Sequence, residues 1–229
     1  MLRIQIIIGS ETQSGICLKM IQQKGNGRMD TVICIGDSLT YGYGVHRAQC
    51  WTKLAAEMSG WTIVNRGVCG DTTGGMLVRM REILREGIGE KNERCFLLMG
   101  GCNVILYSGS NEGAKENMAS MVHQLLSEGE MPLVAIGPGI ADGSFLSRWP
   151  DLVDFPNAIE KAEKYYEWLE RFCRCFGVGV IDFRPDFRDR DGEWRKELYL
   201  DGLHLNPEGH SVMAKRLAKE LAAMERSPL

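Results

Sequence analysis

Five residues whose types suit acyl transfer lie in four short stretches of this 229-residue chain. Ser38 lies in GDSL, Gly70 in NRGVCGDTT, Asn103 in MGGCNV, and both Asp201 and His204 in YLDGLHLN. Acyl transfer needs a nucleophile, a base that takes its proton, a group that orients the base, and donors for the developing oxyanion. Taken together, the four stretches supply one candidate for each of these roles.

The predicted roles follow from the chemistry of each side chain. Ser38 is the predicted nucleophile and His204 the base that takes its proton and returns it to the leaving group. Asp201, three residues before His204, is predicted to hold the other ring nitrogen. The predicted oxyanion donors are the backbone N–H groups of Ser38 and Gly70 and the side-chain amide of Asn103. Glycine at position 70 would let the backbone approach a substrate without a Cβ atom in the way.

Alternating apolar strands and helices predict the scaffold that brings these stretches together. Nearly continuous apolar runs are typical of strands in a parallel sheet that is covered on both faces. The spacing of Met76, Met80 and Ile83 predicts one helix, and Asn206 followed by Pro207 predicts the start of the last helix. Short links between the elements indicate a three-layer α/β/α domain. The predicted strands are 31–35, 61–66, 94–99, 132–137 and 178–182, and a long helix is predicted near 156–176.

Three longer connections follow predicted strands, at residues 67–75, 100–113 and 137–157. In an open α/β sheet the carboxyl ends of the strands form the reactive edge. The third connection contains Phe145, Trp149 and Phe155, which predicts either a wall or lid of a substrate cleft or rings that pack under the loop. The two readings have equal weight.

The stretch GDSL, taken alone, fits two kinds of site. A serine between a strand and a helix can be a nucleophile, or it can form part of a phosphate site at the helix N-terminus. Asp201 and His204 favour the nucleophile, because a phosphate site needs no acid–base pair and gains nothing from a carboxylate. A non-catalytic, flavodoxin-like phosphate-binding module is the alternative from another functional class.

At these residues the chain resembles the GDSL, or SGNH, hydrolase family from about Thr31 to the last helix. The resemblance places the family's serine, glycine, asparagine, aspartate and histidine on Ser38, Gly70, Asn103, Asp201 and His204. It implies a flavodoxin-like fold with a five-stranded parallel sheet in the order 2-1-3-4-5. It also implies that small-molecule esters or thioesters are cleaved without metal or organic cofactor.

The substrates that this resemblance implies are lysophospholipids, acyl-CoA, aryl esters or acetylated sugars. A lipolytic esterase, lysophospholipase or thioesterase is the first reading, and a carbohydrate O-acetyl esterase is the alternative with the same mechanism. The chain departs from the family pattern at one position, because Val104 follows Asn103 where the family usually has aspartate.

Residues 1–28 have no counterpart in the family pattern, so the predicted hydrolase domain spans residues 29–229. Residues 2–8 and 16–22 are two strand-like runs separated by a turn-rich segment. They predict either a β-hairpin or sequence that precedes the true domain, with Met29 as a natural start. A hairpin would have unpaired edges, which predicts a homodimer formed through this segment.

Composition excludes several classes of partner. A net charge of −3 gives no electrostatic case for nucleic acid, and no apolar run approaches the length of about 20 residues that a membrane span needs. Several of the eight cysteines lie inside apolar runs and none forms a CxxC pair, which predicts buried, reduced thiols and a cytoplasmic location. The run DFRDRDGEW lacks the spacing of a calcium loop, and the remaining histidines share no ligand spacing, so no metal site is predicted.

Overall fold

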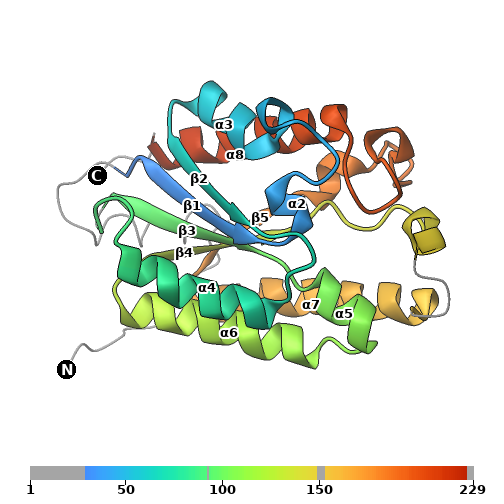
Figure 1. Cartoon of the computed structure of the whole chain (residues 1–229), viewed down its shortest axis with the longest axis horizontal. Helices are drawn as coiled ribbons and strands as arrows, with labels where there is room; N and C mark the ends of the chain where they lie inside the picture. The colour runs from blue at the N-terminus through green and yellow to red at the C-terminus, as the bar shows by residue number, and fades with distance from the viewer. Residues whose placement is uncertain (1–28, 92, 149–152, 226–229) are drawn as a thin grey trace.

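The computed structural model describes residues 29–91, 93–148 and 153–225, and its centre is a five-stranded parallel sheet in the order β2-β1-β3-β4-β5 (Figure 1). Both the order and the parallel pairing confirm the predicted fold. Each predicted strand agrees with an observed one to within one residue at either end. The strands are β1 Thr31–Gly36, β2 Thr62–Gly67, β3 Arg94–Met99, β4 Met131–Ile136 and β5 Gly179–Asp182.

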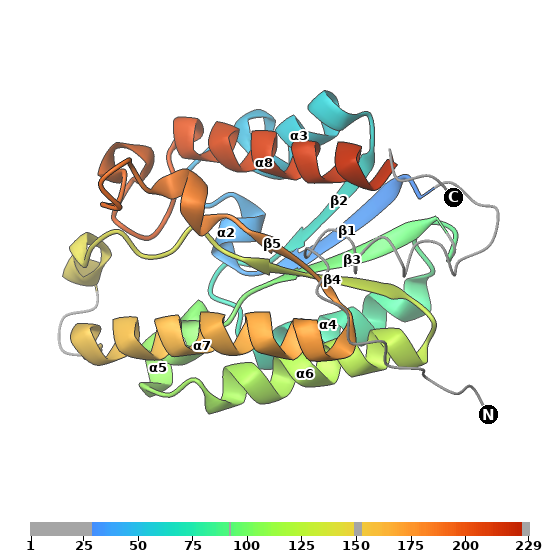
Figure 2. The same ribbon diagram turned by 180° about the vertical axis from the view of Figure 1, so that it is seen from behind.

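Helices cover both faces of the sheet (Figures 1 and 2). One layer consists of α3 Trp51–Ser59 and α8 Pro207–Glu225, and the other of α4 Thr73–Glu86, α5 Cys102–Ser108, α6 Glu112–Ser127 and α7 Phe155–Phe176. The short helix α2 Ser38–Tyr41 directly follows β1. Short 3₁₀ turns complete the described fold, at Arg47–Gln49, Ser144–Arg148, Arg184–Phe187 and Lys196–Leu198.

The predicted N-terminal extension lies outside the described residues. The β-hairpin and the homodimer that was inferred from it therefore stay predictions, as does the boundary at residue 29.

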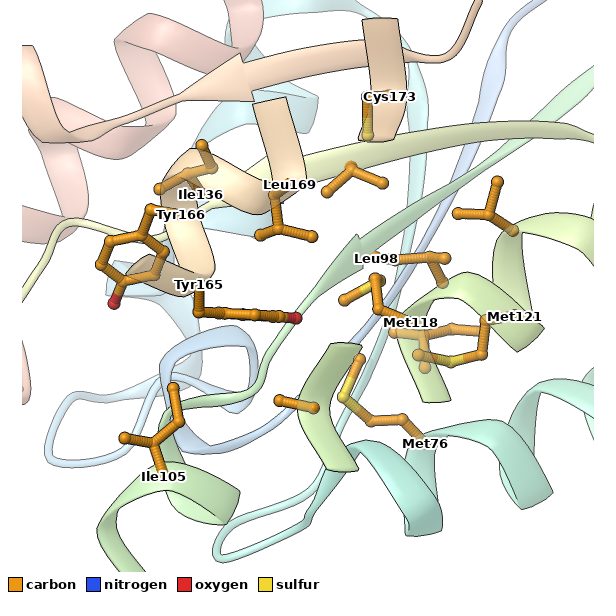
Figure 3. Packing of buried hydrophobic residues seen from close by; sticks show 14 of the residues in the cluster. Met76, Leu98, Ile105, Met118, Met121, Ile136, Tyr165, Tyr166, Leu169 and Cys173 are labelled. Carbon is orange, nitrogen blue, oxygen red and sulfur yellow. The ribbon is translucent and has the colours of Figure 1, made fainter. Parts of the chain in front are cut away.

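Each central strand sends alternate side chains into two separate cores. Ile33 and Ile35 of β1 join the core beneath α4, α6 and α7, whereas Val32 and Cys34 join the core beneath α3 and α8. All six residues of β1 and of β3 are buried, which explains their continuous apolar sequence. Burying each large apolar side chain contributes about 1.5–3 kcal/mol. Figure 3 shows residues of the first core, with methionines of α4 and α6 meeting Tyr165 and Leu169 of α7 around Leu98.

The register of the strands brings three strand ends level with one another. Gly36, the last residue of β1, is aligned with Gly67 at the end of β2 and with Met99 at the end of β3. The three connections that follow therefore leave the sheet at one edge. This edge is where the sequence placed three of the five candidate residues.

The last helix begins as predicted. The Asn206 side-chain oxygen accepts the backbone N–H groups of Glu208 and Gly209, each at 3.0 Å, and Pro207 is the first helical residue. One turn later, His210 is 1% exposed and its Nδ1 accepts the backbone N–H of Trp51 at 3.2 Å. Burial lowers the pKa of His210 to about 4. This histidine therefore ties α8 to α3 as a neutral hydrogen-bond acceptor.

We predict that His210 makes the fold less stable in mild acid. Its pKa of about 4 in the folded state lies below the unfolded value near 6.5, so the unfolded chain binds the extra proton between these pH values. In His210→Asn, the Asn Oδ1 can replace Nδ1 as acceptor but cannot titrate. As the pH falls from about 6.5 to about 4, the wild type should lose about 3 kcal/mol relative to this variant.

Urea unfolding across this pH range measures the effect. His123→Asn, at an exposed position of α6, is the matched control. Loss of its ring contacts with Phe172 and Phe176 can offset the curve, but the pH-dependent loss of stability seen in the wild type should remain. Parallel curves for the wild type and His210→Asn would contradict the assignment.

Candidate active site

Ser38 lies at the turn between β1 and α2. Asp37 caps α2 because its Oδ1 accepts the backbone N–H of Leu39 at 3.0 Å, and Ser38 is the first residue of the helix. The Ser38 side chain is mostly buried, and its Oγ lies 3.1 Å from Nε2 of His204. The two side chains are 166 positions apart in sequence, so the tertiary fold alone brings them together.

Asp201 holds the other side of the His204 ring. Its two oxygens lie 2.9 and 3.2 Å from Nδ1 of His204, and Oδ1 also accepts the backbone N–H of the same residue at 2.8 Å. Burial raises the pKa of Asp201, but the hydrogen bonds from His204 and from the N–H of Leu203 outweigh it, and the net pKa is below its usual value. An ionised carboxylate can only accept, so a neutral His204 ring that bonds to it has its proton on Nδ1 and presents Nε2 to Ser38 as an acceptor.

Contacts on both sides of Asp201 and His204 hold the loop that carries them. The backbone N–H of Leu200 donates to the carbonyl of His204 at 2.7 Å, and Leu203 and Leu205 are buried in the two cores. The ring of Tyr43 packs against the His204 ring, with 4.5 Å between ring centroids. These contacts limit the His204 side chain to the orientation that faces Ser38.

Gly70 and Asn103 lie on the adjoining connections. Gly70 has a φ of +75°, and a Cβ atom there would meet nothing within 4 Å, so its conformation rather than crowding by the protein favours glycine. The Asn103 side-chain amide donates to the backbone carbonyl of Asp71 at 2.8 Å. The loop that contains Gly70 therefore orients the amide. This contact anchors Asn103 even though Val104 stands where the family usually has aspartate.

The connection at 100–113 contains helix α5, which the sequence analysis did not predict. Gly101 precedes this helix with a φ of +122°, and a Cβ atom there would lie 2.5 Å from the ring of Tyr165. The Tyr165 hydroxyl also donates to the carbonyl of Gly100 at 3.1 Å. The buried tyrosine, visible in Figure 3, thus fixes the turn that delivers Asn103 to the sheet edge. The missed helix is only seven residues long, too short for a clear apolar period.

Asp37 is a buried carboxylate beside the nucleophile. It is 4% exposed, and burial raises its pKa to about 6, although the N–H of Leu39 and the Arg79 guanidinium act in the opposite direction. The negative charge of Asp71 adds to the upward shift. The residue therefore changes its charge in the pH range in which many hydrolases are assayed.

Two of the three aromatic residues predicted to line a substrate site lie in described segments. Phe145 is 3% exposed within the core beneath α7, and its ring centroid lies 6.1 Å from that of the partly buried Phe155. This placement favours the reading that the rings pack under the loop. Trp149 lies outside the described residues, and a substrate-lining role for this segment stays a prediction.

Tyr43 and Arg79 are two site neighbours that sequence reasoning missed. Tyr43 lies five residues after Ser38, and nothing in the sequence marked it apart from its aromatic ring. The sequence does contain an indication of Arg79. This residue lies between the buried residues Met76 and Met80 of α4, and a cation in such a position needs a partner of opposite charge. That partner is Asp71, which follows Gly70.

A model of the GDSL-like lipase/acylhydrolase family matches residues 34–212, which include all five candidate residues. The chain belongs to this family. Among curated proteins, esterase TesA of Pseudomonas aeruginosa is 28% identical over 123 residues, which is 52% of this chain and 59% of that esterase. An arylesterase of Vibrio mimicus is 21% identical over 208 residues, covering 84% of this chain and 88% of the other.

Solved structures of the GDSL family and related esterases share this fold. The aryl esterase of M. smegmatis superimposes with a TM-score of 0.70 at 17% identity, covering 85% of this chain and 99% of the other. A carbohydrate acetylesterase family member from Sinorhizobium meliloti gives 0.69 at 19% identity, covering 86% and 99%. At these identities the likeness concerns the fold alone.

The described residues contain neither a candidate membrane span nor a candidate metal site. Within residues 29–91, 93–148 and 153–225, no helix has the length and apolarity to cross a bilayer. In the same segments, no group of three or more histidine, cysteine, aspartate or glutamate side chains is placed to hold a metal ion.

We predict that Asp37→Asn stabilises the protein above pH 6. The folded-state pKa of about 6 exceeds the unfolded value of about 3.8, so the wild type loses stability as the pH rises through this range. Asparagine keeps the capping oxygen without the charge. The wild type should lose about 3 kcal/mol relative to the variant between pH 3.8 and pH 6.

Urea unfolding of both proteins at several pH values measures this gap. With rising pH, Asp37 lowers the free energy of unfolding whereas His210 raises it. The two effects partly cancel in the wild type, so each is measured as a difference between the wild type and its variant. Asp191→Asn, at an exposed position, is the control. A gap that stays constant with pH would contradict the prediction.

Proposed function

We propose that this protein is a serine esterase that cleaves carboxylic esters or thioesters through an acyl-enzyme intermediate. The observation that carries the proposal is the chain of hydrogen bonds from Ser38 Oγ to His204 Nε2, at 3.1 Å, and from His204 Nδ1 to Asp201, at 2.9 Å. Family membership supports the same reaction class.

The proposed first half-reaction forms the acyl-enzyme. His204 takes the hydroxyl proton of Ser38 while Oγ attacks the substrate carbonyl carbon. The backbone N–H groups of Ser38 and Gly70 and the amide of Asn103 donate to the oxyanion. When the tetrahedral intermediate collapses, the bond to the leaving group breaks, and His204 gives its proton to the departing alcohol or thiol.

The second half-reaction repeats these steps with water. His204 takes a proton from water, whose oxygen attacks the acyl carbon, and the acyl–Ser38 bond then breaks. Ser38 recovers its proton from His204, and the carboxylic acid leaves. Asp201 stays ionised throughout and stabilises the positive charge that His204 carries in each transition state.

The phosphate-binding alternative has less support. The Ser38 hydroxyl is within hydrogen-bond distance of a base, and that base is held by a carboxylate whose pKa is lowered. A phosphate site needs no such base and gains nothing from a carboxylate nearby. No contact among the described residues specifically favours this module over the esterase.

The proposed substrate is a small-molecule ester or thioester. A lipolytic esterase, lysophospholipase or thioesterase remains the first reading, and a carbohydrate O-acetyl esterase is the alternative. The names of the curated relatives, an esterase and an arylesterase, are consistent with the first. The cytoplasmic location and the homodimer are predictions that need separate experiments.

Replacing Ser38 tests the reaction class. Ser38→Ala should abolish hydrolysis of p-nitrophenyl acetate above the background rate, because the proposed mechanism has no other nucleophile, while circular dichroism and melting temperature stay unchanged. Ser127→Ala, at an exposed position of α6, is the matched control and should keep full activity. Wild-type turnover in Ser38→Ala would refute the proposal.

A panel of substrates tests the substrate class. The wild type should hydrolyse p-nitrophenyl esters with kcat/KM that varies systematically with acyl length from acetyl to dodecanoyl, and acyl-CoA and acetylated xylan oligosaccharides should be measured beside them. A preference of at least 10-fold for the acetylated sugar over p-nitrophenyl acetate would favour the carbohydrate alternative.

A further inference from the structure

We propose that Arg79 is a positioning residue for the oxyanion site, acting through Asp71 on Gly70 and Asn103. This inference rests on the esterase function proposed above. Arg79 lies on α4 and takes no part in the chain from Ser38 to Asp201. Its role is to hold the loop that carries two of the three proposed donors.

The Arg79 guanidinium joins three segments at the sheet edge. Its Nε donates to Asp71 Oδ2 at 2.8 Å, and Nη2 donates to the same carboxylate oxygen and to the carbonyl of Gly36 at 3.0 Å. Nη1 donates to the carbonyl of Arg66. One side chain thus links the end of β1, the end of β2 and the Gly70 loop.

Asp71 passes this constraint on to both proposed donors. It directly follows Gly70, and its backbone N–H donates to the carbonyl of Val68 at 3.2 Å, which closes the turn that contains Gly70. Its carbonyl accepts the Asn103 amide at 2.8 Å, which leaves the other amide hydrogen for an oxyanion. The Asp71 carboxylate also accepts the N–H of Thr72 at 2.9 Å. A shift of Asp71 would therefore move both donors together.

The packing around this pair leaves it little freedom. The side chains of Asp71 and Arg79 are 13% and 21% exposed, against 40% and 49% for the surface pair of Arg66 and Glu86. A Cβ atom on Gly75 would lie 1.8 Å from Asp71 Oδ1, so the carboxylate fits closely against the first turn of α4. Exposed ion pairs are loosely held, whereas this one is enclosed and has several hydrogen bonds.

Only arginine fits these contacts. Its planar fork can reach one carboxylate and two carbonyls simultaneously, while the single ammonium of lysine cannot cover the same span. Loss of one oxyanion donor typically costs about 100- to 1,000-fold in kcat. Misplacing both donors by a fraction of an ångström should therefore slow the chemical step more than it weakens substrate binding.

The first test separates kcat from KM. Arg79→Met keeps most of the side-chain volume and should lower kcat on the order of 100-fold with p-nitrophenyl acetate, while KM changes by less than about 3-fold. Arg79→Lys should recover only part of this loss. Arg81→Met, on the exposed side of the same helix, is the matched control and should behave as wild type. A folded Arg79→Met with kcat within 3-fold of wild type would overturn the proposal.

A second test asks whether Arg79 acts through the donors. The kcat losses of Arg79→Met and Asn103→Ala should be strongly non-additive in the double variant, because both disturb the same oxyanion site. Independent, multiplying losses would contradict the proposal. If Arg79→Met does not fold, Arg79→Ala assayed with added guanidinium replaces it. Recovery of at least 10-fold in kcat supports the proposal, and no recovery in the folded variant counts against it.

The two hypotheses fail in different ways. An active Ser38→Ala would remove the esterase function itself, and the inference about Arg79 with it. An inactive Ser38→Ala together with full kcat in the Arg79 variants would support the esterase function and reject only the positioning role of Arg79.

Discussion

The aligned ends of β1, β2 and β3 are the constraint on which the rest of the site depends. Gly36, Gly67 and Met99 are level in the sheet, so each following connection starts from the same edge. Ser38, Gly70 and Asn103 follow these residues by only a few positions. Because β1 and β3 are buried between two cores, a one-residue slip in register would move each side chain into the opposite core, where it does not fit. The cores therefore fix the geometry of the edge.

The two helical layers contribute different parts of the candidate site. The layer of α3 and α8 holds the loop before α8, through the capped start of α8 and the hydrogen bond from Trp51 to His210, and so positions Asp201 and His204. The opposite layer contains α4 and α5, which hold the Gly70 loop and Asn103. The turn after β1 lies between them. The proposed proton transfer and the proposed oxyanion stabilisation thus depend on separate parts of one fold.

Three carboxylates near the candidate nucleophile differ in how well their negative charge is compensated. Asp71 is paired with the Arg79 guanidinium, and Asp201 accepts hydrogen bonds from the ring and backbone of His204. Asp37 has weaker compensation for its burial, so its pKa rises to about 6. A site proposed to stabilise an oxyanion benefits from this arrangement, because negative charge beside the substrate is either neutralised or held away by fixed donors.

The sequence alone determined the five strands, their parallel order and the five candidate residues, because strand ends and apolar periods are local features and because the motifs around Ser38 and His204 resemble those of a known family. It did not determine the contacts made across long sequence separations. Val104 left the anchoring of Asn103 open until the carbonyl of Asp71 was found to accept its amide, and Phe145 proved to be buried within the core. Only the tertiary structure decided these points, because hydrogen-bond partners and burial depend on how separate elements pack rather than on the residues next to one another in the chain.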